Sequence, residues 1–334
     1  MRAEAPATPA REASVYDPLG YDLPLPLKAR YYPVGYPLDL VTNSEDVLRA
    51  ANYIWGQFPP STWQSDAATL RVIVDDRDAL LPPVASMPRG QNHLVSFVHG
   101  PDNFAVCDLA RSFTFACLTQ DVASDASYIR YHFLEPAGYL MVDAAHLCPV
   151  HASCVSLNGR AMLLCGDAGA GKTSLAYACA RNGWTYLSDD ATHIVRASTD
   201  YAVAGRPFRI RFRESGRKLF PELSVFTPEL RPNGKLDIEV ETSALGIATA
   251  FESHASHVVF LNRRPDVKRA EIRMFARCAA LDRLSQLICY GDARIRSEQS
   301  RALADFLQLP IVELGYRDLD DAEQTLRALA GGAE

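Results

Sequence analysis

The sequence predicts an α/β protein in which a P-loop domain follows a smaller α+β domain. A Gly-x-x-x-x-Gly-Lys-Thr motif occupies residues 166–173, between a short apolar run and a helical one. From residue 144 onward, strand-like runs alternate with helical runs, which is the pattern of βα units. Before that point, short β-like runs surround two helical stretches. We therefore predict a tail over residues 1–20, an α+β domain over 21–143 and the P-loop domain over 144–334.

Bulk composition narrows the class of protein. The 334 residues are 48% hydrophobic and 22% charged, as in ordinary soluble globular proteins. A net charge of -6 argues against a nucleic-acid partner, which would call for a basic surface. The Ala- and Pro-rich tail lacks the apolar core of a signal peptide, and no apolar run approaches the ~20 residues of a membrane span. We expect a cytoplasmic protein that binds neither nucleic acid nor membrane.

The cysteine pattern predicts no structural metal site. Eight cysteines are scattered along the chain without a Cys-x-x-Cys pair. Five of them lie in apolar stretches, which is typical of buried, reduced thiols in a cytosolic protein.

Both domains show recognisable element patterns. In the first, Ser44 is a suitable N-cap for a helix, β-like runs cover residues 69–76, 93–100 and 112–120, and a helical stretch covers 125–140. In the second, we predict a strand over 161–165, a helix over 172–182 ended by Gly183, and a strand over 184–188 leading into two carboxylates. Further alternation toward the C-terminus predicts a largely parallel sheet, and Asn233-Gly234 predicts a hairpin turn.

The P-loop motif predicts a nucleotide triphosphate site that uses Mg²⁺. Its glycines allow backbone N–H groups to curl around phosphate oxygens, and the following helix directs its positive end at them. Lys172 supplies a mobile cation, and the Thr173 hydroxyl is placed to ligate Mg²⁺. The predicted nucleotide-binding residues are Gly166, Asp167, Ala168, Gly169, Ala170, Gly171, Lys172, Thr173 and Ser174.

Asp189 and Asp190 distinguish phosphate transfer from simple nucleotide binding. They end the strand after the P-loop helix, and a parallel strand beside the loop strand would deliver them to the phosphate side of the sheet. One carboxylate there can hold Mg²⁺ while the other accepts a proton from an attacking hydroxyl. An N-cap or a solvated turn is the alternative interpretation, because Asp favours both.

Two further features have both a functional and a structural interpretation. If residues around His151 form a strand beside the loop strand, this histidine reaches the γ-phosphate region; otherwise it is an ordinary core histidine. Arg209, Arg211 and Arg213 alternate with apolar residues, so they share one face of a predicted strand. That stripe can clamp a phosphate or an acidic substrate, or it can be the solvated face of an edge strand.

These motifs together resemble the HPr kinase/phosphorylase family. A Val-His pair at Val150-His151 precedes the P-loop, and an Asp pair follows the next strand at the family's spacing. The resemblance covers residues 148–196. It implies a phosphoenolpyruvate-carboxykinase-like P-loop kinase domain that binds ATP and Mg²⁺. It also implies that one of Asp189 and Asp190 is the general base toward a serine hydroxyl, that the other binds metal, and that His151 lies near the transferred phosphate.

With its departures from that family, the chain more closely resembles an HPr-kinase-related branch. The family's Glu-Ile-Arg-Gly signature has no match, Ala168 replaces a usual serine, and Ser174 stands where an acidic residue is usual. Some members of the related branch phosphorylate serine in ribosomally made peptides. The resemblance therefore implies a protein or peptide partner that carries a serine, and it leaves homo-oligomer formation and the role of the first domain (substrate recognition or assembly) open.

Two other functions remain open from the residues alone. A kinase acting on a small-molecule alcohol would need the same core. A P-loop ATPase or switch would need no acceptor, but the guanine-reading Asn-Lys-x-Asp motif and a Leu-Ser-Gly-Gly-Gln-like signature are both absent.

Overall fold

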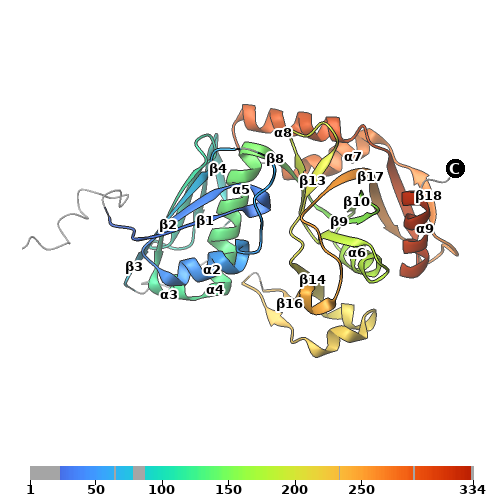
Figure 1. Ribbon diagram of the computed structural model, residues 1–334, viewed down its shortest axis with the longest axis horizontal. Helices are drawn as coiled ribbons and strands as arrows, with labels where there is room; N and C mark the ends of the chain where they lie inside the picture. Colours follow the sequence, from blue (N-terminus) through green and yellow to red (C-terminus); the bar gives the residue numbers. More distant parts are fainter. Residues whose placement is uncertain (1–22, 64, 78–86, 233, 289, 332–334) are drawn as a thin grey trace, which may run out of the picture.

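The computed structural model describes residues 23–63, 65–77, 87–232, 234–288 and 290–331. It contains two sheet-based units side by side, with a small third sheet below them in the view of Figure 1. The predicted tail over 1–20 and Asn233 of the predicted hairpin lie outside the described residues. None of the helices in the described part has the length and apolar character that crossing a lipid bilayer requires.

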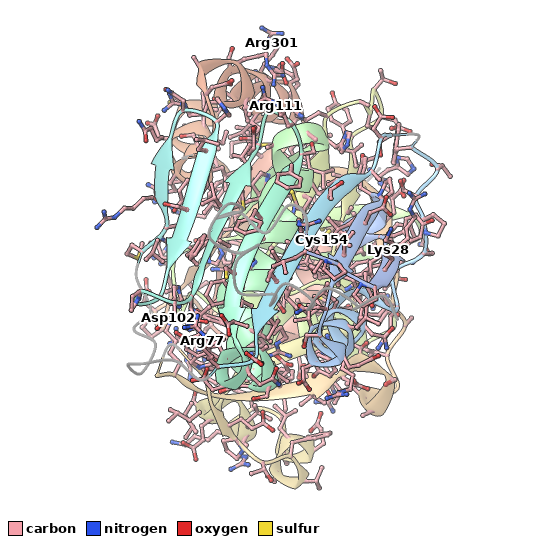
Figure 2. All side chains as sticks on the ribbon, turned by 90° about the vertical axis from the view of Figure 1, so that its left-hand side faces the viewer. Lys28, Arg77, Asp102, Arg111, Cys154 and Arg301 are labelled. Atoms are coloured by element: carbon pink, nitrogen blue, oxygen red, sulfur yellow. The ribbon has the colours of Figure 1, made fainter. Side chains whose placement is uncertain are left out.

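The first unit is built on a seven-stranded sheet with the order β1-β2-β3-β7-β6-β5-β4. The β-like runs expected at 69–76, 93–100 and 112–120 are confirmed as β3, β5 and β7. Its strands are β1 (Leu27–Tyr31), β2 (Leu38–Thr42), β3 (Ala68–Asp75), β4 (Arg89–Gln91), β5 (Leu94–Val98), β6 (Phe104–Asp108) and β7 (Phe113–Thr119). Figure 2 looks onto the face of this sheet that carries no helix.

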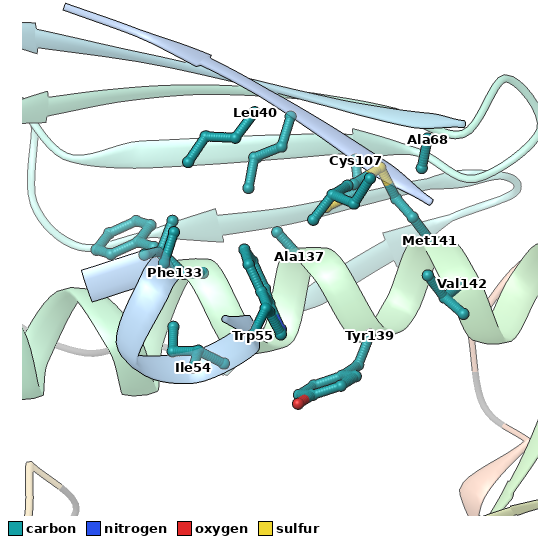
Figure 3. Packing of buried hydrophobic residues seen from close by; sticks show 14 of the residues in the cluster. Leu40, Ile54, Trp55, Ala68, Cys107, Phe133, Ala137, Tyr139, Met141 and Val142 are labelled. Carbon is teal, nitrogen blue, oxygen red and sulfur yellow. The ribbon is translucent and has the colours of Figure 1, made fainter. Parts of the chain in front are cut away.

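Helices cover the opposite face of the seven-stranded sheet (Figures 1 and 3). They are α2 (Glu45–Trp55), α3 (Gln120–Ser124), α4 (Ala126–Ile129), a π-helical turn (Arg130–Leu134) and α5 (Glu135–His146). Trp55 of α2 is 1% exposed and packs against α5, where a Cβ on Gly138 would lie 2.5 Å from the indole ring. Glycine at this position therefore sets how closely the two helices approach.

The second unit contains a nine-stranded sheet that is mixed, so the prediction of a largely parallel sheet is wrong. Among its described strands, the pairs β10–β17 and β17–β19 are parallel, and the remaining pairs are antiparallel. The strands are β8 (Leu147–Val150), β9 (Ala152–Leu157), β10 (Arg160–Cys165), β11 (Thr185–Ser188), β12 (Thr192–Val195), β13 (Ala202–Ala204), β17 (Glu252–Arg263), β18 (Glu271–Met274) and β19 (Ile311–Tyr316).

Helices cover both faces of this sheet and form two separate apolar cores. Leu175 of α6 and Leu326 of α9 are buried in one core, while Leu284 of α7 and Leu303 of α8 are buried in the other. The helices are α6 (Lys172–Arg181), α7 (Arg277–Leu284), α8 (Ala293–Phe306) and α9 (Leu319–Gly331). The expected helix after the P-loop is confirmed and ends one residue earlier than predicted.

A three-stranded sheet, β14-β16-β15, lies beside both larger units. It consists of β14 (Arg209–Arg213), β15 (Glu229–Leu230) and β16 (Leu236–Glu241). The alternation that the sequence predicted for β14 is confirmed, because Ile210 and Phe212 are buried in the core around α6. Short 3₁₀ turns complete the chain: Pro33–Gly35, Glu214–Lys218, Pro221–Val225, Thr242–Leu245 and Ser285–Leu287.

The Glu239 carboxylate on β16 joins the first unit to the small sheet. Its oxygens accept hydrogen bonds from Arg130 of the π-helical turn at 2.9 Å, from Arg211 at 2.8 Å and from Arg231 at 2.7 Å. Its side chain is 13% exposed, so these are largely desolvated ion pairs. Burial alone would raise the Glu239 pKa, but Arg211 and Arg130 lower it from 4.5 to about 2.

We expect Glu239→Gln to destabilise the protein by roughly 3 kcal/mol at pH 7, because the glutamine no longer neutralises the surrounding arginines. A lowered carboxyl pKa stabilises the fold above 4.5, and this contribution is lost as the pH falls from 4.5 toward 2. Urea unfolding at pH 7 and pH 3 measures the difference. Glu241→Gln on the same strand is the matched control, because Glu241 is 51% exposed and lies 3.9 Å from Arg209. An equal effect of both substitutions would contradict the role assigned to Glu239.

Candidate functional site

The P-loop turns between β10 and α6 at one edge of the nine-stranded sheet. Gly166, Gly169 and Gly171 all have positive φ angles, of 154°, 90° and 96°. At Gly171 a Cβ would also lie 2.4 Å from the hydroxyl of Tyr316, which donates a hydrogen bond to the Ala170 carbonyl oxygen at 2.9 Å. Glycine is therefore required where the loop becomes helix α6.

Lys172 is the first residue of α6 and folds back over the loop. Its Nζ donates hydrogen bonds to the carbonyl oxygens of Gly166 at 2.6 Å and Asp167 at 3.3 Å. Burial lowers the pKa of this ammonium group, and Asp190 is the main charge that opposes the shift. The loop therefore holds the lysine in place at the start of α6. The first N–H groups of this helix point toward the same side of the loop as the lysine.

The strand that carries Asp189 and Asp190 is not the neighbour of the loop strand, which corrects the sequence prediction. β9 lies between β10 and β11 and is antiparallel to both. Two antiparallel steps make β11 parallel in direction to β10, so the two strands still end at the same edge of the sheet. The aspartates therefore reach the P-loop side by a different topology from the one expected.

Asp189 is the buried member of the pair. Its side chain is 9% exposed, its Oδ2 accepts a hydrogen bond from the Arg211 backbone N–H at 3.1 Å, and its Oδ1 is buried without a partner among the described residues. Burial raises the Asp189 pKa from 3.8 to about 6, against the opposing effects of the Thr173 hydroxyl and the Arg211 N–H. A buried carboxylate oxygen without a donor beside a threonine hydroxyl is the kind of site that a divalent cation satisfies.

Asp190 and His151 form a second, solvent-facing pair. His151 lies directly before β9, in the strand arrangement that the sequence analysis specified. Its Nδ1 is 3.2 Å from Asp190 Oδ1 and 3.0 Å from the Asp190 carbonyl oxygen. Both side chains are well exposed, at 45% and 65%. The residues from before β9 and after β11 are thus brought together at the loop.

One cleft of about 510 Å³ contains most of these groups. The loop contributes Ala168, Gly169, Gly171, Lys172, Thr173 and Ser174, and His151, Asp189 and Asp190 lie on the same wall. Gly166, Asp167 and Ala170 are not among the residues that line the cleft. Their carbonyl oxygens accept the hydrogen bonds from Lys172 and Tyr316.

The cleft also contains residues that sequence reasoning missed. Tyr131 comes from the π-helical turn of the first unit, Arg231 and Lys235 flank the turn between β15 and β16, and Arg263 ends β17. The cleft therefore contains six cationic side chains and three carboxylates, in a protein of net charge -6. The cations are Lys172, Arg211, Arg213, Arg231, Lys235 and Arg263. Such a cationic cleft suits a polyanionic ligand. Motif reasoning could not find these residues, because only tertiary packing brings them together.

The predicted arginine stripe divides into three different environments. Arg209 lies 3.7 Å from the centre of the Tyr53 ring and donates a hydrogen bond to the Tyr53 carbonyl oxygen at 2.7 Å. Arg211 pairs with Glu239, and Arg213 is exposed at the cleft. Neither sequence interpretation describes the whole stripe, because two of its members bind other parts of the protein.

Comparison with known proteins gives similarity to solved structures alone, and that similarity is distant. No family model and no curated protein sequence matches the chain. Among solved structures, the chain is similar to the Hpr(Ser) kinase/phosphatase from Coxiella burnetii, with 11% sequence identity and a TM-score of 0.30 over 54% of this chain and 89% of that chain. The similarity is of a mixed α/β fold with several sheets and assigns no residue role.

We expect Asp189→Asn to stabilise the metal-free protein by about 1–3 kcal/mol at pH 8, because folding buries a charge that the amide lacks. The raised pKa fixes the sign: the ionised carboxylate costs stability above pH 6, the cost shrinks between 6 and 3.8, and it is absent below 3.8. Urea unfolding in chelator at pH 8 and pH 4 measures the difference. Asp190→Asn is the matched control, since that side chain is 65% exposed. A destabilised Asp189→Asn protein at pH 8 would refute the assignment of an uncompensated buried charge.

Proposed function

We propose that this protein is a kinase that transfers the γ-phosphate of ATP to a serine hydroxyl of a protein or peptide, with Mg²⁺ as cofactor. The observation that carries the proposal is the convergence of the P-loop and an aspartate pair on one cleft, which Lys172, Thr173, Asp189 and Asp190 all line. A nucleotide switch requires the loop and a metal ligand, whereas a second carboxylate at the phosphate position is what a hydroxyl acceptor requires.

The environments of the two aspartates suggest separate roles. Asp189 is buried beside Thr173 and has an oxygen without a hydrogen-bond donor, so we assign Mg²⁺ binding to this pair. Asp190 is exposed and adjacent to His151, so we assign it the role of accepting the proton of the attacking hydroxyl. The histidine would orient this carboxylate. When bound, Mg²⁺ neutralises charge on the β- and γ-phosphates.

The remaining groups position and neutralise the nucleotide. The N–H groups at the start of α6 and the Lys172 ammonium supply fixed positive charge to the phosphates. Arg213, which is exposed at the cleft and has no ion pair within the described residues, is placed to add a further cation. Catalysis by such a site is positioning and charge neutralisation, with the carboxylate as proton acceptor.

The deciding experiment follows the label of γ-labelled Mg-ATP in a lysate of the source cell with purified protein. We expect label on a protein or peptide serine, and we expect the Asp189→Asn/Asp190→Asn double variant to lose at least about 10³-fold in rate, because metal binding and base are both removed. Phosphoamino-acid analysis of the labelled material identifies the acceptor residue. A double variant with wild-type labelling would contradict the site.

The same experiment separates the two other functions. Label on a small molecule would indicate an alcohol kinase with the same core. Label released only as inorganic phosphate, at a rate unaffected by lysate, would indicate an ATPase and overturn the transfer proposal.

A further inference from the structure

A second, smaller cavity opens on the other side of the aspartate pair, between the first unit and the nine-stranded sheet. Asp189, Asp190 and Arg211 line both this cavity and the P-loop cleft. We call it the interdomain chamber. The rest of its lining comes from the end of α2, from α5, from the residue after Asp190 and from the start of β14: Ile54, Phe58, Glu135, Tyr139, Ala191, Arg206, Phe208 and Arg209. The aspartate pair is thus reached from two directions.

The apolar walls of the chamber limit what fits inside. Phe58 and Phe208 meet edge to face with ring centres 4.8 Å apart, and Tyr139 projects from the side of α5 that faces away from the seven-stranded sheet (Figure 3). The volume of about 60 Å³ has room for roughly four to six water-sized groups. That space fits a short aliphatic hydroxyl with its nearest substituent. A tyrosine side chain with its backbone is too large.

Arg206 is the unusual charge in the chamber. Four nearby arginines, Arg130, Arg209, Arg211 and Arg231, each have a carboxylate oxygen within 4.0 Å. Arg206 has no carboxylate this close among the described residues, and its guanidinium lies 4.4 Å from the centre of the Tyr139 ring. Arg206 also makes a side-chain hydrogen bond with Tyr139. The neutral tyrosine holds the cation in position without neutralising it, so the remaining guanidinium donors are available to an anion.

The other arginines at the chamber already have carboxylate partners. Arg130 and Arg211 lie 3.7 and 3.8 Å from Glu135, and Arg211 binds Glu239. Asp190 is beside His151. A ligand that brings a carboxylate to Arg206 would therefore gain a charge-assisted hydrogen bond without displacing an ion pair.

We propose that the interdomain chamber binds the hydroxyl-bearing end of the acceptor, and that Arg206 selects acceptors whose aliphatic hydroxyl is close to a carboxylate. The inference rests on the kinase function proposed above. The acceptor oxygen would form a bond to the γ-phosphorus as the bond from that phosphorus to the β–γ bridging oxygen breaks. The hydroxyl proton passes to a carboxylate of the aspartate pair, and ADP leaves on the cleft side. The carboxylate can belong to the serine itself or to a neighbouring acidic residue.

Small probes separate these sources. N-acetyl-L-serine and its amide differ only in the α-carboxylate of the serine. Ac-Ser-Asp-NH₂ and Ac-Ser-Asn-NH₂ differ only in the side-chain carboxylate of the residue after the serine. In at least one pair we expect the acid to exceed the neutral probe by about tenfold or more in kcat/KM with Mg-ATP, as a charged hydrogen bond to arginine would give. The acid/neutral ratio should fall to about one in Arg206→Met and recover in part in Arg206→Lys. Arg273→Met on β18 is the control, because Arg273 is 60% exposed and pairs with Glu271.

Binding measured separately from transfer distinguishes the two proposals. Calorimetric titration of the same probes, with Mg²⁺ and a non-hydrolysable ATP analogue, does not depend on phosphorylation. An Arg206-dependent preference in binding without transfer would support the chamber and refute the kinase function. Three outcomes would overturn the acceptor assignment. They are an acid/neutral ratio that is the same in wild type and Arg206→Met, no binding of any serine probe, and phosphorylation of N-acetyl-L-tyrosine as efficient as that of N-acetyl-L-serine.

Discussion

The ion pairs of Glu239 are the interaction on which the rest of the site depends. Glu239 holds Arg130 of the first unit and Arg211 of β14 against one desolvated carboxylate. The backbone N–H of the same Arg211 donates to Asp189 Oδ2 and so fixes the direction of that carboxylate. The contact between the units and the geometry at the P-loop are therefore linked through a single residue. Movement of the first unit relative to the small sheet would therefore shift the Asp189 carboxylate through these contacts.

The parts of the site that sequence reasoning placed correctly are those governed by local rules. The P-loop requires glycines at positive φ and a helix directly after them, and both requirements are visible within ten residues of sequence. The Asp pair was expected at the loop edge because it follows an apolar strand, and it lies there. The interposed β9 could not be predicted, because two parallel strands with an antiparallel strand between them give the same local sequence pattern as two adjacent ones.

The arginine stripe illustrates the opposite limit. Alternation correctly predicted which residues of β14 are buried, since period two follows from strand geometry. It carried no information on what the other face contacts. Arg209 contacts a tyrosine that precedes it by 156 positions, and Arg211 pairs with Glu239 on the neighbouring strand β16 and with Glu135 of α5. Charged side chains at long sequence separation are paired by the packing of whole units, which no window of sequence contains.

The two openings onto the aspartate pair give a physical reason for having a first unit at all. A P-loop cleft that is open to water favours hydrolysis, because water competes with any acceptor for the γ-phosphate. Here Ile54, Phe58 and Tyr139 cover the far side of the aspartates with apolar surface, and the remaining space is about 60 Å³. An acceptor that fills this space would displace the few waters able to reach the phosphate from that direction. If the protein is the kinase proposed above, the first unit would both select the acceptor and exclude water, and the Glu239 ion pairs would hold it in the position that both roles require.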